Sequence, residues 1–202
     1  IVFPGSTIPF FVGRKASMDA LDRALAGDRE IFVVSQIDSS VENPEENDLY
    51  EIGVLGRIVQ VMRLPNGTVK ALFEGSKRGK LIASKLEKKE FLVKVEPVEE
   101  IMYDYDYEKV KKMSIQVCDL FKKHVDQTKT KFNEEDVKSI EELDELLVSD
   151  RVVSLMELPR EKKQQFLEML NPETRLLNVL EVLKDELKIV QLGDKFKKEA
   201  ND

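Results

Sequence analysis

The stretch LPNGTVKALFEG at residues 64–75 combines a tight turn with a run of strand-forming residues. Pro65 lacks the backbone N–H that it would need if Asn66 and Gly67 formed a two-residue turn. A three-residue loop avoids this conflict, because Pro65 then takes its first position and Gly67 its left-handed bulge position. The sequence therefore predicts a hairpin in which Leu64 is the last residue before the loop.

This loop also predicts how the two strands of the hairpin pair. The expected partners are Leu64 with Thr68, Met62 with Lys70, Val61 with Ala71, and Val59 with Phe73. Side chains alternate between the two faces of a strand, so one face should carry the core residues Val59, Val61, Ala71 and Phe73. Met62 and Leu64 should then stand exposed on the other face.

The rest of residues 1–103 has short apolar runs separated by turn-forming residues, which is typical of a small β-barrel or sandwich. One helix is expected to interrupt it, with Ser17 as its N-cap and Gly27 at its end. The stretch SSVENPEEND at residues 39–48 has turn formers and acidic residues without periodicity, and it predicts an exposed loop.

Residues 104–202 change to a helical period, and the fold class is therefore predicted to be α+β, with a β-rich domain over 1–103 followed by an all-α bundle. Pro159 and Pro172 mark the expected starts of two late helices. The last helix should bury a seam of apolar residues at heptad spacing, Leu176, Leu180, Leu183, Leu187 and Val190.

The composition limits the function classes. The chain has 202 residues, 42% of them hydrophobic, and 39 acidic against 32 basic residues give a net charge of −7, so the average field repels nucleic acid. A single cysteine, Cys118, fits a reducing compartment. We find no apolar run near the roughly 18 residues that span a bilayer. Because the first residue is Ile1, we expect the chain to be part of a longer protein.

The search for catalytic, metal or cofactor sites yields no candidate residues. The stretch GSKRGKL at residues 75–81 has three residues between its glycines where a P-loop has four, so it is interpreted as a loop between strands. Its cations Lys77, Arg78 and Lys80 remain a minor candidate for nucleic-acid binding. His124 is the only histidine, has no metal-ligand partner, and is interpreted as a surface residue.

The order of these features resembles the amino-terminal domain of the ATP-dependent Lon proteases. Three blocks carry the resemblance: IPFFVGRKASMDAL at residues 8–21, NDLYEIGVLGRIVQVMRLPNGTVKALFEG at 47–75, and KKQQFLEMLNPETRLLNVLEVLKDEL at 162–187. The second block is quite specific, since it joins an acidic loop, a Tyr-x-x-Gly-x-x-Gly strand, the hairpin and a Glu-Gly stop. The likeness covers nearly the whole chain.

The resemblance implies a PUA-like β-rich domain followed by a helical bundle that leads through a long helix to an AAA+ ATPase and a Ser-Lys protease. It further implies capture of unfolded or damaged proteins, assembly into a homo-hexamer, and a cytoplasmic, bacterial setting. ATP and magnesium would act in the parent protease. This chain contains no Walker motif and no protease dyad, so neither activity is assigned to any of its residues.

Our hypothesis for the binding surface combines Met62, Leu64 and Pro65 of the hairpin with the amino-terminal trio Ile8, Pro9 and Phe10. Flexible methionine suits promiscuous partners because it fits many side chains. The alternative is that these residues are scaffold, with Ile8 and Phe10 in the core. Two other functions stay open, a free-standing Lon-type domain that binds a peptide or small ligand, and a regulatory nucleic-acid binder.

Overall fold

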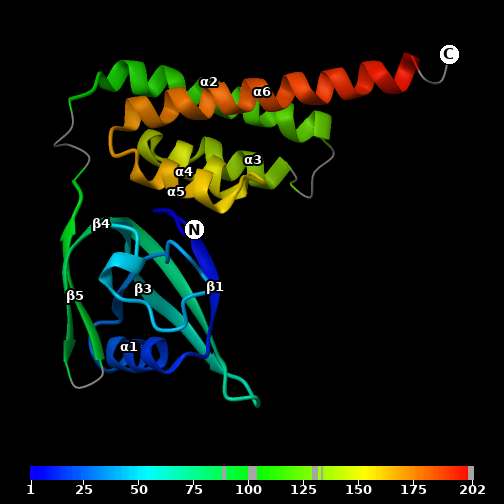
Figure 1. Ribbon diagram of the computed structural model, residues 1–202. Coiled ribbons are helices and arrows are strands. Elements are labelled where there is room, and N and C mark those ends of the chain that lie inside the picture. Colours follow the sequence, from blue (N-terminus) through cyan, green and yellow to red (C-terminus); the bar gives the residue numbers. More distant parts are fainter. Residues whose placement is uncertain (88–89, 100–103, 129–131, 133, 200–202) are drawn as a thin grey trace. The chain divides into compact units, whose positions relative to one another are not determined.

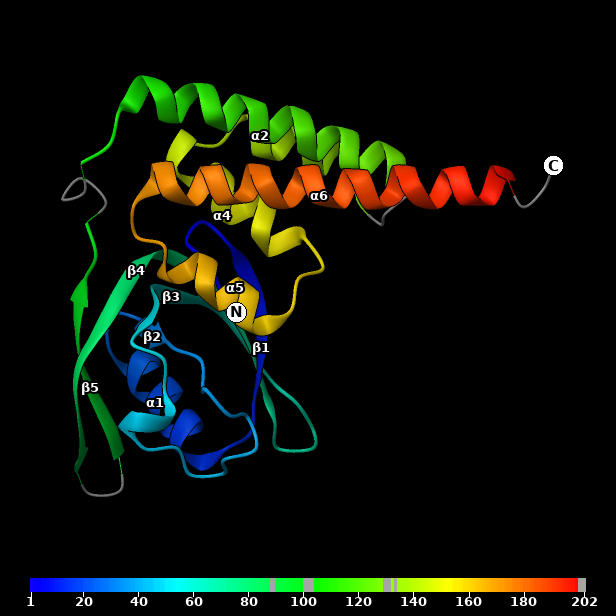
Figure 2. The same ribbon diagram turned by 45° about the horizontal axis from the view of Figure 1, so that its top comes forward.

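The computed structural model describes residues 1–87, 90–99, 104–128, 132 and 134–199 (Figures 1 and 2). The chain divides into two compact units, Ile1–Glu99 and Glu100–Asp202. Over the residues described, the first holds the strands and the second holds helices without strands, which confirms the predicted α+β class. The boundary expected at residue 103 lies outside the described residues.

The β-rich unit is built on one antiparallel sheet. Its elements are β1 (Thr7–Val12), α1 (Lys15–Ala26), β2 (Glu30–Val33), the 3-10 helix η1 (Glu46–Asp48), β3 (Ile52–Arg63), β4 (Val69–Glu87) and β5 (Glu90–Pro97). The strand order is β1-β4-β3-β2, and β5 pairs with β4 as well. The long β4 therefore supports three strands, while α1 contacts β2 and β5.

The loop at the hairpin tip has the predicted conformation. Gly67 adopts a positive φ of 82°, which is the left-handed region that glycine tolerates best. The backbone N–H of Leu64 donates to the carbonyl oxygen of Thr68 at 2.8 Å, and the N–H of Gly67 donates to Leu64 at 3.0 Å. Pro65 therefore needs no ladder hydrogen bond, as the sequence argument required.

The predicted register holds near the tip and fails farther from it. Met62 pairs with Lys70, and Val61 pairs with Ala71, as predicted. The pairing of Val59 with Phe73 is wrong, because a register shift between Ile58 and Gln60 makes Ile58 the partner of Phe73. Ile58 is buried in the core, and Val59 is left 39% exposed.

The interpretation of residues 75–81 as a loop is also wrong. These residues continue β4, which pairs with β3 on one side and with β5 on the other. Gly75 is therefore not the end of a strand, because it pairs with Gly56 of β3. A second register shift lies at this point, between Leu55 and Gly56. The glycines let two backbones approach closely at this point.

The first helix ends where predicted but begins earlier. It starts at Lys15 with Arg14 as N-cap, and no side chain caps it, so Ser17 lies inside the helix instead of at its start. Gly27 follows the last helical residue and donates its N–H to Ala24. Leu21 and Ala24 lie about one turn apart on the same face of the helix. Both are buried, so this face points toward the core.

The helical unit comprises α2 (Tyr107–Thr128), α3 (Glu134–Glu141), α4 (Glu145–Leu155), α5 (Arg160–Glu168) and α6 (Pro172–Glu199). Figures 1 and 2 both show α2 alongside α6, and these two helices share extensive contacts. The predicted seam of α6 is buried at Leu176, Leu180, Leu183 and Leu187. Pro172 is the first residue of α6, and Pro159 is the N-cap of α5.

His124 is not the surface residue that the sequence suggested. It lies on the buried face of α2 with 9% exposure, and its ring stacks on Phe121 with centroids 6.4 Å apart. Burial lowers the pKa of His124, and the carboxylate of Glu186, 3.9 Å from Nε2, opposes this shift. His124 therefore contributes to the packing of α2 against α6.

Among the described residues, no helix combines the length and the apolar character needed to cross a membrane.

Candidate functional site

A row of three side chains crosses one face of the sheet near the hairpin tip. Phe11 of β1 pairs with Lys70 of β4, and Lys70 pairs in turn with Met62 of β3. Residues directly opposite each other in a sheet project from the same face. Phe11 is 67% exposed and Met62 is 52% exposed. This face therefore points two large apolar side chains into solvent.

The neighbouring row extends the same face. Pro9, Leu72 and Gln60 are cross-strand partners two residues away from the first row, and Pro9 is exposed while Leu72 is half-buried. The bulge exposes Val59 beside them. We call this surface the outer apolar face and define it by Pro9, Phe11, Val59, Met62, Leu64 and Leu72.

The structure divides the hypothesised residues into two groups. Met62 and Pro65 are exposed, and Leu64 is half-buried at the tip. Ile8 and Phe10 are half-buried and lie on the opposite face of β1, where Phe10 packs with its ring centroid 5.8 Å from that of the buried Phe73. These two residues therefore lie apart from the exposed face that carries Met62.

Phe11 is the exposed aromatic that the sequence reasoning missed. The stretch TIPFFV forms β1, so its side chains alternate between the faces of the sheet. Proline suits an edge strand, and placing Pro9 outward would have placed Phe11 outward as well. The alternation along TIPFFV predicts that Pro9 and Phe11 share one face, and that Ile8 and Phe10 share the other.

The outer apolar face combines exposed apolar side chains with an open strand edge. Among the described residues β1 pairs only with β4, so its other edge offers backbone groups to an added strand. Lys70 is the one charged side chain within the two rows, and its Nζ lies 6.0 Å from the ring centroid of Phe11. Its aliphatic stem adds apolar area between Phe11 and Met62.

The basic trio does not form a cationic surface. Arg78 is 2% exposed, because this position of β4 points into the unit. Lys77 lies 3.3 Å from a carboxylate oxygen of Glu99, and Lys80 lies 3.7 Å from one of Glu51. The three side chains are therefore separated by burial and by neighbouring carboxylates, and they give the nucleic-acid hypothesis no support.

The described part of the chain contains no cluster of three or more His, Cys, Asp or Glu residues arranged to hold a metal ion. Burial raises the pKa of the Cys118 thiol to about 11, with nearby carboxylates of Glu141 and Asp119 adding to the shift. The thiol is therefore protonated at neutral pH and is a poor nucleophile.

The sequence of residues 1–185 matches the family model of the ATP-dependent protease La (LON) substrate-binding domain. The chain is 32% identical over 193 residues to the Lon protease of Halothermothrix orenii, covering 95% of this chain and 24% of that protein. It is 35% identical over 196 residues to that of Clostridium acetobutylicum, covering 95% and 25%.

Two solved structures share the fold. The N-terminal domain of the Mycobacterium avium complex Lon protease superposes with a TM-score of 0.74 at 19% identity, over 92% of this chain and 93% of that one. The Lon N-terminal domain protein from Xanthomonas campestris gives a TM-score of 0.60 at 16% identity, over 89% and 91%. The chain spans about a quarter of the length of the curated relatives named above.

Proposed function

Because the chain belongs to the family of ATP-dependent protease La (Lon) substrate-binding domains, we propose that it is the substrate-recognition and assembly module of a Lon-type protease. In this role it captures unfolded or damaged proteins at the outer apolar face. The observation that carries the proposal is the exposed row of Phe11 and Met62, which flanks Lys70 across three strands.

The proposal extends to the whole protein from which this domain comes. That protein is an ATP-dependent serine endopeptidase that works as a homo-hexamer in the bacterial cytoplasm, with its Ser-Lys dyad and its ATP and magnesium site outside this segment. The AAA+ and protease domains of the same chain are then the partners of this module. The module then holds a substrate protein until the AAA+ domain engages that substrate.

The apolar face suits this task because the features of unfolded chains that differ most from folded surfaces are exposed apolar side chains and free backbone groups. Burying one large apolar side chain contributes about 1.5–3 kcal/mol when burial is complete, and correspondingly less for partial burial. Two such contacts give a weak, reversible interaction. Methionine adapts its shape to different partners, which favours breadth over selectivity.

Replacing both exposed residues, with Phe11→Ser and Met62→Ser, should weaken binding of a permanently unfolded protein about tenfold, since about 1.4 kcal/mol of contact energy corresponds to this factor. The probe is reduced, carboxymethylated α-lactalbumin, and the measurement is fluorescence anisotropy with the isolated 202-residue chain. The two positions are on the surface, so the free energy of unfolding should change little.

The matched control replaces two exposed apolar residues outside the face, Ile37 and Ile82, which are 51% and 43% exposed. The double variant with serine at these positions should bind as the unchanged chain does. Equal weakening by both pairs would mean that general surface hydrophobicity binds the probe. Unchanged binding by the Phe11 and Met62 pair would eliminate the outer apolar face as the site.

A further inference from the structure

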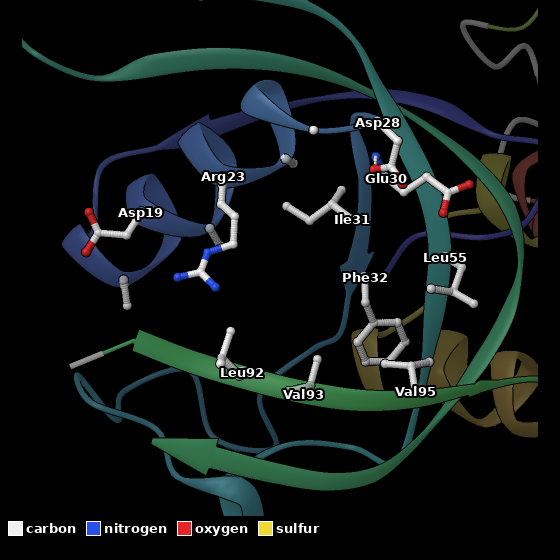
Figure 3. Close-up of a pocket in the computed structure, with 14 residues that line it drawn as sticks. Asp19, Arg23, Asp28, Glu30, Ile31, Phe32, Leu55, Leu92, Val93 and Val95 are labelled. Carbon is white, nitrogen blue, oxygen red and sulfur yellow. Dashed lines mark hydrogen bonds between the residues drawn. The ribbon is translucent and has the colours of Figure 1, made fainter. Parts of the chain in front are cut away.

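A cavity of 540 Å³ lies in the β-rich unit among α1, β2, β3 and β5, apart from the outer apolar face (Figure 3). Its volume falls within the range of about 300–1,000 Å³ that is typical of ligand sites. The strands line it with apolar side chains, namely Ile31, Phe32, Leu55, Leu92, Val93 and Val95. The cavity is therefore large enough for a few residues of a peptide.

The cavity borders the edges of two strands. Successive residues of a strand point to opposite faces, yet both Ile31 and Phe32 of β2 line the cavity, and so do both Leu92 and Val93 of β5. A space lined in this way lies beside a strand and not over one of its faces. Among the described residues β2 pairs only with β3, and β5 pairs only with β4, so each has an edge without a neighbouring strand.

One end of the cavity is closed by tight packing. Phe32, Leu55 and Val95 converge over Gly79 of β4, where an added Cβ would lie 2.6 Å from Cγ1 of Val95 and 3.1 Å from Cε2 of Phe32. Figure 3 shows Phe32 beside Val95 at this end, with Leu92 farther along β5. The cavity thus has a firm apolar floor at this end, and α1 lines it as well.

The charges around the cavity have an excess of acid. Among the described residues that line it, Asp19, Asp28 and Glu30 are acidic and Arg23 is basic. Figure 3 shows Asp28 and Glu30 together near the start of β2, while Asp19 and Arg23 project from α1. Three carboxylates against one guanidinium give these described residues an excess of two negative charges, and this field favours a cationic ligand.

We propose that this cavity is a second peptide-binding site, which takes an extended segment with apolar side chains flanked by lysine or arginine. The apolar side chains occupy the space between Ile31 and Leu92, the backbone pairs with the open edge of β2, and the flanking cations meet the carboxylates of Asp19 and Glu30. This is strand addition with charge selection. It does not depend on the function proposed for the outer apolar face.

The test uses two labelled pentapeptides and the 202-residue chain. The probe acetyl-Lys-Leu-Val-Leu-Lys-amide should bind at least tenfold more tightly than acetyl-Glu-Leu-Val-Leu-Glu-amide at low ionic strength, and added salt should reduce this preference. Methylating the valine nitrogen should weaken binding several-fold, because it removes a backbone donor. Equal affinities for the two peptides, or indifference to the methyl group, would overturn the proposal.

Variants of α1 locate the bound peptide. Ala20 is exposed and lines the cavity, whereas Ala26 is exposed on the same helix and does not line it. Ala20→Phe should weaken binding of the basic peptide at least tenfold, and Ala26→Phe should leave it within twofold. The Phe11→Ser and Met62→Ser pair should also leave it unchanged. Binding that survives Ala20→Phe, or that is lost in that serine pair, would refute this location.

Charge reversal provides an independent check on selectivity. The double variant Asp19→Lys and Glu30→Lys should invert the preference, so that the acidic peptide becomes the tighter ligand. Both side chains are polar surface groups of the cavity rim, so the fold should persist, which far-UV circular dichroism can verify. An unchanged preference for the basic peptide would show that these carboxylates do not select the ligand and would overturn the proposal.

Discussion

Replacing Asp150 with alanine should destabilise the helical unit by about 3–5 kcal/mol, because the buried guanidinium of Arg175 then loses the carboxylate that compensates its charge. Asp150 of α4 and Arg175 of α6 are both 0% exposed, and the Nε of Arg175 lies 3.3 Å from Oδ1 of Asp150. A loss of this size is a large part of the 5–15 kcal/mol that stabilises an ordinary domain.

Arg175 connects three helices, which explains why its charge needs compensation. Its Nε donates to the hydroxyl of Ser149 at 2.9 Å, its Nη1 to the carbonyl oxygen of Met169 at 2.8 Å, and its Nη2 to that of Leu146 at 3.2 Å. Ser149 and Leu146 belong to α4, and Met169 is the C-cap of α5. These bonds engage all three nitrogens of the guanidinium, but its formal charge remains buried.

Hydrogen exchange read by mass spectrometry gives the opening free energy of α4 and α6 separately from the β-rich unit. The matched control is the double variant Asp150→Leu with Arg175→Met, which removes both charges and should be markedly more stable than Asp150→Ala. A loss below about 1 kcal/mol in Asp150→Ala, the value of an exposed ion pair, would contradict the role assigned to this pair.

Replacing Gly56 with alanine should destabilise the β-rich unit by about 3 kcal/mol or more, because an overpacked core forces the backbone to shift. A Cβ at Gly56 would lie 2.1 Å from the carbonyl oxygen of Glu74 and 2.6 Å from the ring of Phe73. The first atom belongs to the backbone of β4 and cannot rotate away. The pairing of β3 with β4 must therefore open at this register shift.

Gly13 provides a matched control for this substitution, since an added Cβ there would meet nothing within 4 Å. Gly13→Ala should change stability by no more than about 0.5 kcal/mol, as for other open surface positions. Amide hydrogen exchange of the segments that form β3 and β4, read by mass spectrometry, distinguishes the two variants. If Gly56→Ala were as stable as Gly13→Ala, the close approach of β3 and β4 would be refuted.

The local rules of turn chemistry were sufficient to predict the hairpin tip. Pro65 excludes one turn and Gly67 favours the other, so the pairings of Met62 and Val61 followed directly. The bulge at Val59 could not be predicted in this way, because it depends on which residues best fill the core. Ile58 and Phe73 meet there, and this packing outweighs strict alternation.

The length of β4 could not be predicted because its sequence carries loop signals. Glycines and lysines at residues 75–80 suggest a turn when taken alone, yet β3 and β5 supply partners on both sides. Tertiary pairing decides the conformation here. The Tyr-x-x-Gly-x-x-Gly pattern has a related explanation, since Gly53 and Gly56 both sit where another backbone comes too close for a Cβ.

The buried pair of Asp150 and Arg175 was also beyond sequence reasoning. Acidic and basic residues on amphipathic helices are usually solvent-facing, and a single chain gives no sign of which ones pair across helices. The interpretation of His124 as a surface residue was wrong for a similar reason, because a polar side chain on a helix is usually exposed, yet His124 is buried. At the candidate site, the alternation of side chains along β1 decides which residues face solvent. It separates Phe11, which is exposed, from Phe10, which packs on Phe73.

The most direct test of substrate capture at the outer apolar face is methyl nuclear magnetic resonance of the methionines. Met62 lies in the face, whereas Met113 and Met156 are buried in the helical unit and act as internal controls. When reduced, carboxymethylated α-lactalbumin is added, the methyl signal of Met62 should shift or broaden while those of Met113 and Met156 stay in place. Saturated binding with an unchanged Met62 signal would contradict the proposed site.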